Sequence, residues 1–208
     1  MLRKSVNCNN MKPSTVIFIG PQGSGKGTQI ELLYKVITEQ DPLRRVVDIQ
    51  TGRRFRGLAA KRETYAERKI ERSLDSGALQ PDFLTHILWG QAMLDQLDPK
   101  SHLLIDGFPR TVAQAKVLEE AFVFFERDKI DVINLDTPEG VVRKRMEERA
   151  RDDDTADSIE TRLKWYREDT IPVLDYYRNR ADTNVHDIDG TMDIDRVHGE
   201  ILKSLNLD

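Results

Sequence analysis

A glycine-rich turn reads Gly20-Pro21-Gln22-Gly23-Ser24-Gly25-Lys26-Gly27-Thr28. It follows the apolar, β-branched run Thr15–Ile19 and precedes residues 29–37, whose apolar residues have helical spacing. A strand, a glycine-rich turn and a helix in this order direct backbone N–H groups and the positive end of the helix toward one anion. Lys26 adds a point charge for terminal phosphates. We therefore predict a phosphate-binding loop formed by Gly23, Ser24, Gly25, Lys26, Gly27 and Thr28.

Two oxygen-bearing side chains predict a magnesium site beside this loop. Phosphate loops usually carry Ser or Thr directly after the lysine, but here Gly27 intervenes and the hydroxyl comes one residue later, on Thr28. Asp106 follows the apolar run 103–105, and an Asp at the carboxyl end of a central strand can orient Mg²⁺. We expect Mg²⁺ as the cofactor, oriented by Asp106 and Thr28 directly or through water.

The length and charge of the chain exclude several classes of protein. Its 208 residues suit one domain, and its net charge of −4 lacks the basic excess typical of a nucleic-acid binder. No apolar run approaches the length of a membrane span. The single cysteine, Cys8, permits no internal disulfide and fits a reducing compartment. We expect a cytoplasmic protein with neither nucleic-acid nor membrane partners.

Short β-branched runs alternate with longer segments of helical periodicity, which predicts an α/β fold with a parallel sheet between two layers of helices. The expected strands are Thr15–Ile19, Val46–Ile49, His102–Ile105, Val132–Leu135 and Asn184–Ile188. The expected helices are Lys26–Glu39, Phe55–Ser76, Pro81–Leu97, Val112–Arg127, Pro138–Glu148, Ser158–Arg180 and Asp193–Leu205. We expect residues 1–14 to be a flexible leader and residues 15–208 to form a single domain.

The segment Asp106-Gly107-Phe108-Pro109-Arg110 directly follows one of the expected strands. Ligands bind at the carboxyl ends of the strands in parallel sheets. Gly107 lets the chain turn tightly beside a ligand, and Pro109 restricts the backbone before Arg110. The planar guanidinium of Arg110 suits phosphate oxygens. The alternative is an ordinary loop with a surface arginine, and the neighbouring phosphate loop makes this alternative less favoured.

The phosphate loop and the Asp-Gly-Phe-Pro-Arg segment together resemble the adenylate kinase family of nucleoside monophosphate kinases. The resemblance covers nearly all of the chain after residue 14. It implies a P-loop NTPase fold with a five-stranded parallel sheet, a helical flap at residues 51–82 for the nucleoside monophosphate, and a short lid at residues 149–157. It also implies transfer of the terminal phosphoryl group of MgATP to AMP, giving two ADP, and we expect the enzyme to be a monomer.

The same resemblance assigns the site residues. The matches to the family's AMP-binding side are Thr51, Gly52, Arg56, Gln80, Gly107, Arg110 and Gln114. The matches on the ATP-binding side, beyond the phosphate loop, are Arg145, Arg149 and Gly190. The expected catalytic residues are Lys26, Arg110, Arg151 and Arg162.

A simpler interpretation stays open for several of these charged residues. Arg145 and Arg149 lie one helical turn apart, and they could belong to a solvated helix face instead of a phosphate site. Asp152, Asp153 and Asp154 resemble acidic neighbours of the lid arginines, but they could also cap the helix that follows, since acids favour a helix N-terminus.

Arg53 departs from the family pattern, which has Asp directly after Thr-Gly. The reversed charge could strengthen the hold on the acceptor phosphate, or it could disturb the magnesium shell. The resemblance associates Thr51 and Gln114 with AMP as the acceptor, and a UMP/CMP kinase is the near alternative. Arg53 and the displaced hydroxyl also leave open a nucleotide-binding regulator that has lost catalysis. A P-loop NTPase that uses water as acceptor is the third alternative.

Overall fold

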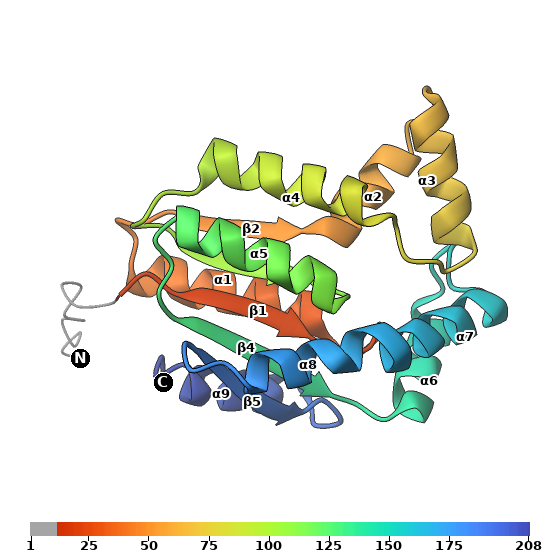
Figure 1. The fold of residues 1–208 in the computed structure, drawn as a ribbon. Helices are drawn as coiled ribbons and strands as arrows, with labels where there is room; N and C mark the ends of the chain where they lie inside the picture. The colour runs from red at the N-terminus through yellow and green to blue at the C-terminus, as the bar shows by residue number, and fades with distance from the viewer. Residues whose placement is uncertain (1–11) are drawn as a thin grey trace.

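The computed structural model of this chain describes residues 12–208. Its centre is a sheet of five parallel strands in the order β2-β3-β1-β4-β5 (Figure 1). Every expected strand is confirmed, and four of them are longer than predicted at one or both ends. The strands are β1 (Thr15–Ile19), β2 (Val46–Gln50), β3 (His102–Asp106), β4 (Ile130–Asp136) and β5 (Thr183–Asp189). Because β1 is the central strand, the phosphate loop leaves the middle of the sheet.

Helices cover both faces of the sheet, because alternate residues of each buried strand point to opposite faces and both sets are apolar. On one face lie α1 (Lys26–Gln40) and α9 (Ile194–Ser204). On the other face lie α4 (Asp82–Gln96), α5 (Val112–Phe124) and α8 (Ile171–Arg178). The predicted α/β, P-loop NTPase fold with a five-stranded parallel sheet is therefore confirmed.

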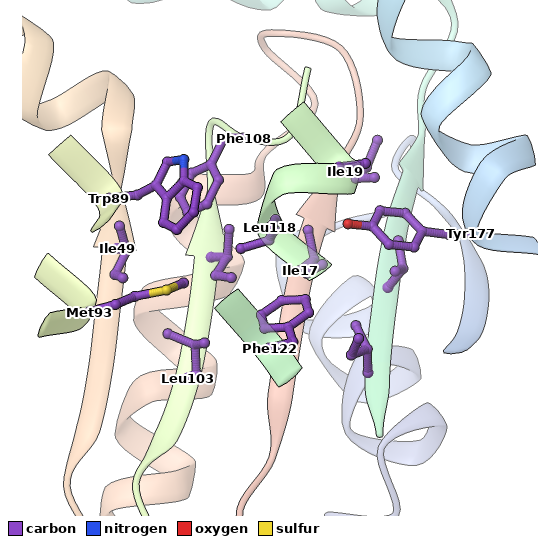
Figure 2. Close-up of a cluster of buried hydrophobic side chains, with 14 of the residues drawn as sticks. Ile17, Ile19, Ile49, Trp89, Met93, Leu103, Phe108, Leu118, Phe122 and Tyr177 are labelled. Atoms are coloured by element: carbon purple, nitrogen blue, oxygen red, sulfur yellow. The ribbon is translucent and has the colours of Figure 1, made fainter. Parts of the chain in front are cut away.

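Figure 2 shows the apolar core between the sheet and the helices α4, α5 and α8. The Trp89 and Phe108 rings stack there with their centroids 5.5 Å apart. Phe108 is buried although it belongs to the turn after β3, so it fixes that turn to the core. Stacked aromatic pairs contribute about 0.5–1.5 kcal/mol beyond the area that they bury. The core thereby holds Asp106 and Arg110, on either side of Phe108, in place.

Residues 51–76 form two helices, where the sequence predicted one helix over Phe55–Ser76. The first, α2 (Thr51–Ala59), begins directly after β2, and α3 (Tyr65–Asp75) starts anew after Thr64. The Thr64 hydroxyl accepts a hydrogen bond from the Glu67 N–H at 3.2 Å, and the Glu67 carboxylate accepts one from the Thr64 N–H at 2.8 Å. Such a capping box fixes a helix start. The prediction of one continuous helix was wrong because this Thr-x-x-Glu signal was overlooked.

The predicted helix Ser158–Arg180 is also divided. It consists of α7 (Ala156–Trp165), a π-helical turn, η1 (Tyr166–Thr170), and α8. Proline lies in the first turn of α8, where its missing N–H costs nothing to the helix. π-helical turns are rare and are frequent at functional sites. The turn between α6 (Glu139–Arg149) and α7 forms the short segment predicted as a lid.

Two segments extend beyond the carboxyl edge of the sheet: helices α2 and α3, and the connection from α6 to α7 (Figure 1). None of the helices within residues 12–208 is long and apolar enough to span a membrane. Most of the predicted leader, including Cys8, lies outside the described residues. At its end, the Ser14 N–H donates a hydrogen bond to Nδ1 of His102 at 3.1 Å.

Candidate active site

A cavity of about 420 Å³ lies at the carboxyl edge of the sheet. Its lining carries seven cationic side chains and two carboxylates, so the ligand that suits it is strongly anionic. The cations come from the phosphate loop, α2, the turn after β3, α6 and the turn after α6. The charged lining residues are Lys26, Arg53, Arg56, Arg110, Arg145, Arg149, Arg151, Glu31 and Asp106.

The phosphate loop enters α1 at Lys26. Gly25, the residue before the helix, has a φ of 101°, a left-handed conformation that glycine adopts at no steric cost. The Lys26 ammonium donates hydrogen bonds to the carbonyl oxygens of Gly20 and Pro21, both at 2.8 Å. Burial lowers the pKa of Lys26 to about 7, although Asp106 acts in the opposite direction. A polyphosphate in the cavity would favour the charged form of this lysine.

Asp106 ends β3 and lines the cavity. Its Oδ1 atom is buried and has no hydrogen-bond partner among residues 12–208. Buried carboxylate oxygens normally have a partner, so this atom suits a water molecule or a cation. Thr28 lines the same cavity from α1. One carboxylate and one hydroxyl fit Mg²⁺, which keeps several waters and is shared with substrate phosphates.

Arg110 is held by the residues around it. Its Nε donates to the carbonyl oxygen of Gly107 at 3.2 Å, and its backbone N–H donates to Oε1 of Gln114 at 2.7 Å. The Gln114 amide nitrogen in turn donates to Asp82 at 2.7 Å, at the start of α4. Burial lowers the pKa of Arg110, and Asp106 opposes that shift. Arg110 therefore lines the cavity in a fixed position, and an anion there would offset the cost of burying its charge.

Arg149 and Arg162 converge on Asp154, whose side chain is fully buried. Arg149 donates through Nε at 2.6 Å and through Nη2 at 2.9 Å, and Arg162 donates through Nη1 at 2.6 Å. Arg162 also donates to Oδ2 of Asp153 at 2.7 Å. Despite the burial of Asp154, its hydrogen bonds and charge interactions with the two arginines keep its pKa below the usual range. We refer to these four residues as the lid ion-pair cluster.

The cap of α7 is Thr155, whose hydroxyl accepts a hydrogen bond from the Ser158 N–H at 3.2 Å. The alternative in which Asp152–Asp154 cap this helix is therefore wrong. Next to the cluster, desolvation and the neighbouring Arg149 lower the pKa of Arg151. On α6, Nη1 of Arg145 donates to the carbonyl oxygen of Gly190 at 2.8 Å. These contacts show that Arg145 and Arg149 are not members of a merely solvated helix face.

Residues 18–182 match the family model described as adenylate kinase. The chain belongs to the adenylate kinase family. Similar proteins include Adenylate kinase 1 of Nostoc sp., 41% identical over 165 residues, which cover 79% of this chain and 85% of that protein. The adenylate kinase of Corynebacterium urealyticum is 38% identical over 180 residues (83% and 93%). That of Nocardia farcinica is 35% identical over 190 residues (91% and 98%). The predictions of a phosphotransferase and of a nucleoside monophosphate kinase are confirmed.

Most of the residues that the sequence predicted for nucleotide binding line the cavity. They are Gly23, Gly25, Lys26, Gly27, Thr28, Gly52, Arg56, Asp106, Gly107, Arg110, Arg145, Arg149 and Arg151. The predicted residues outside the lining are Ser24, Thr51, Gln80, Gln114, Arg162 and Gly190. Thr51 is buried, and its hydroxyl lies 3.5 Å from the Asp106 carbonyl oxygen. The amide nitrogen of Gln80 is buried without a hydrogen-bond partner among the residues that the structure describes.

Three further residues line the cavity without having been assigned to it from the sequence: Gln22, Glu31 and Gln50; Arg53, considered above for the acceptor phosphate or the magnesium shell, also lines it. Arg53 donates to Oε1 of Glu31 at 2.9 Å, so the reversed charge after Thr-Gly has a carboxylate partner on α1. Glu31 lies four residues after Gly27, on the same side of the helix, and this spacing could have identified it. Gln50 ends β2, and the carboxyl end of a strand was the available signal.

Proposed function

We propose that this enzyme transfers the terminal phosphoryl group of MgATP to AMP and yields two ADP. The observation that carries the proposal is the convergence of seven cationic side chains on one cavity beside the phosphate loop. Two nucleotides held with their phosphates facing each other bring roughly six negative charges, on the scale of about two per terminal phosphate. The relatives described above are adenylate kinases, which supports the same reaction.

The donor nucleotide is assigned to the side of the cavity formed by the phosphate loop and α6. Backbone N–H groups of the loop, from Gly23 to Thr28, hold the phosphates at the N-terminus of α1. Arg145 and Arg149 neutralise the phosphates from α6. The Arg145 bond to the Gly190 carbonyl supports the assignment of the turn after β5 to the donor adenine.

The acceptor nucleotide is assigned to the opposite side, between α2 and the turn after β3. Arg56 and Arg110 are proposed to bind the AMP phosphate, with Gly52 and Gly107 allowing close approach of the backbone. Thr51, Gln80 and Gln114 are proposed to contact the adenosine part. Gln114 binds Asp82 and the Arg110 backbone in this conformation, so its contact with the base requires an exchange of the Asp82 hydrogen bond.

The magnesium ion is assigned to the part of the cavity lined by Asp106 and Thr28, which would hold it directly or through water. It would neutralise charge on the phosphates during transfer. In the transfer, an oxygen of the AMP phosphate forms a bond to the terminal phosphorus of ATP, and the bond from that phosphorus to the bridging oxygen breaks. The leaving electron pair stays on the β-phosphate of the new ADP. No covalent enzyme intermediate is required.

Catalysis is assigned to cations that bind the transferred group more tightly at the transition state than in the ground state. We propose this role for Lys26, Arg110, Arg151 and Arg162. Arg162 pairs with Asp153 and Asp154 in this conformation, and its side chain is 3% exposed. Its catalytic role therefore includes an exchange of a carboxylate for a phosphate when the lid turn closes.

The segments 51–82 and 149–157 are proposed to close over AMP and ATP, because an open site would let water accept the phosphoryl group. Small-angle scattering with and without a bisubstrate dinucleotide tests this closure, and binding without a fall in the radius of gyration would contradict it. We propose a monomer as the working unit.

The experiment that tests the proposed reaction is an acceptor panel of AMP, dAMP, GMP, CMP and UMP at fixed ATP and Mg²⁺. We expect AMP to give the highest kcat/KM, by a factor of about 100 or more over CMP and UMP, because unpaired polar groups around the wrong base are costly. Faster turnover with UMP or CMP would make the enzyme a pyrimidine kinase. Phosphate release independent of any acceptor would indicate a hydrolase, and ATP binding without turnover would indicate a regulator.

A further inference from the structure

One face of α7 lies against the turn that follows α3 in the flap. Ser158, Arg162 and Trp165 are spaced four and three residues apart, so they share this face. Arg162 donates from Nη2 to the carbonyl oxygen of Leu74 at 3.2 Å. The indole N–H of Trp165 donates to the carbonyl oxygen of Gly77 at 2.9 Å. Figure 1 shows the end of α3 beside α7, although these partners are separated by 88 residues in the chain.

Gly77 allows the two segments to touch backbone to backbone. It has a φ of 71°, and it follows α3 in a turn in which the Ala78 N–H bonds the Ser73 carbonyl and the Gly77 N–H bonds the Leu74 carbonyl, both at 3.0 Å. This is the Schellman arrangement that ends a helix. A Cβ atom on Gly77 would lie 2.8 Å from Cα of Ser158. The turn at Gly77 is therefore packed on the first turns of α7.

The ring of Trp165 makes a second contact, with Arg110. The guanidinium carbon of Arg110 lies 5.2 Å from the centroid of a half-buried Trp165 ring, within range of a cation–π interaction. Arg110 lines the cavity, whereas Trp165 does not. Trp165 therefore lies behind the arginine and contacts both the guanidinium and the flap turn.

The π-helical turn explains how one helix reaches Arg110 twice. Thr170, at the end of η1, donates from its hydroxyl to the Arg110 carbonyl oxygen at 3.0 Å. In an α-helix of 3.6 residues per turn, residues five apart, such as 165 and 170, point in different directions. The i to i+5 bonding of a π turn brings such residues to the same side.

We propose that Trp165 is a positioning residue that holds Arg110 toward the acceptor phosphate and couples this arginine to the turn at Gly77, which follows α3 in the flap. The inference rests on the assignment of Arg110 to the acceptor phosphate made above. When the flap moves, the Gly77 carbonyl moves with it, and the indole transmits that movement to the guanidinium. The effect is expected on the acceptor side, because the Trp165 side chain contacts Arg110 and the Gly77 carbonyl.

Two substitutions separate the two contacts. Trp165→Phe keeps an aromatic face for Arg110 and removes the N–H that binds Gly77, whereas Trp165→Leu removes both. We expect Trp165→Leu to raise the KM and the Kd for AMP by about 5- to 30-fold, the range of a partly desolvated cation–π contact, with the KM for ATP changed less than about twofold. Trp165→Phe should keep the AMP affinity within about threefold, because phenylalanine also presents a negative ring face. It should still speed hydrogen exchange at the amides of residues 76–79.

A double-mutant cycle with Arg110→Ala decides whether Trp165 acts through Arg110. In that background Trp165→Leu should weaken AMP binding no further, since the interaction it removes is already absent. Tyr65→Leu, which removes a 72% exposed aromatic ring elsewhere on the flap, is the matched control and should leave the KM values unchanged. If Trp165→Leu does not fold, Trp165→Met takes its place, since methionine fills more of the volume without a ring face.

Three outcomes would overturn the inference. The first is a folded Trp165→Leu enzyme with AMP affinity equal to the parent. The second is an equal loss for AMP and ATP, and the third is an undiminished loss in the Arg110→Ala background. The assignment of Arg110 fails separately, namely if Arg110→Ala itself binds AMP as tightly as the parent enzyme does.

Discussion

The two segments beyond the sheet, the flap and the lid turn, are held by different forces. The flap has an apolar cluster of its own, formed by Phe55, Ala59 and Ile70, and the capping box at Thr64 begins its second helix. The lid turn is held instead by the lid ion-pair cluster, in which Asp154 joins two arginines. One segment is stabilised by buried apolar area, and the other by charges that are themselves candidates for binding phosphate.

This difference predicts two kinds of movement. Apolar side chains of the flap do not compete with a nucleotide for partners, so the flap is expected to move as a body about its ends. The arginines of the lid turn can bind either a carboxylate or a phosphate, so nucleotide binding is expected to rearrange the lid cluster. The lid turn is therefore expected to act as a switch between internal and ligand ion pairs, and the flap as a rigid cover.

Removal of the Lys26 charge should have the largest effect. We expect Lys26→Met to lower kcat by a factor of about 1,000 or more, the scale of one lost electrostatic contact to a transferred group. Burial lowers the pKa of this lysine to about 7, so its charge is costly in the ligand-free protein and the variant should fold normally. A coupled ADP assay and circular dichroism measure the two quantities. Activity near that of the parent would remove Lys26 from the mechanism.

The next largest effect should come from breaking each segment in turn. Ile70→Ala removes most of a 3% exposed side chain and should destabilise the flap by about 2 kcal/mol or more, with weaker AMP binding. Asp154→Asn should cost about 3 kcal/mol, because it leaves two buried or half-buried arginines without a full carboxylate. The two freed arginines should nevertheless bind ATP more tightly, by a few-fold. Thermal unfolding and calorimetric titration with each nucleotide measure these changes.

The opposite signs of stability and affinity in Asp154→Asn are what distinguish the lid from the flap. Asp152→Asn, at an exposed neighbouring position, is the control and should alter neither quantity. Parallel losses of stability and ATP affinity in Asp154→Asn would mean that the cluster is a scaffold and not a switch.

The sequence predicted the frame of this site more fully than its ion pairs. The strands and the phosphate loop were predictable because β-branched runs and glycines act locally, and the Thr64–Glu67 signal of the second flap helix was present, although it was missed. The partners of Arg162 depend on how a turn folds back on a helix, and several interpretations of Asp152–Asp154 fitted the sequence equally well. The π turn and the contact of Trp165 with Gly77, 88 residues away, have no local signal at all.

A smaller effect should appear as a proton taken up when the donor nucleotide binds. Since burial lowers the pKa of Lys26 to about 7, this lysine is mostly neutral at pH 8 in the ligand-free enzyme. A polyphosphate favours the charged form and raises this pKa, so ATP binding at pH 8 should take up about one proton. For the same reason, ATP affinity should fall as the pH rises above about 7. Titration calorimetry in two buffers of different ionisation enthalpy measures the uptake. Lys26→Met should abolish it, and uptake that persists in the variant would assign the proton to another group.

The smallest effect should come from the exposed ion pair that bridges the flap and the phosphate-loop helix. Arg53 and Glu31 are 62% and 61% exposed, so the pair contributes less than about 1 kcal/mol to stability.

Arg53→Asp places a new carboxylate near Glu31 in the lining of the cavity that also contains Asp106, and the added negative charge should attract Mg²⁺. We expect the half-saturating Mg²⁺ concentration to fall by about two- to fivefold, on the scale of one exposed charge interaction. Arg54→Asp makes the same charge change at a neighbouring residue outside the cavity lining, and it should leave the magnesium titration where it is in the parent enzyme. If both variants give the same magnesium titration, the charge at position 53 acts only through the net charge of the flap. Arg53 then has no local effect on the magnesium site.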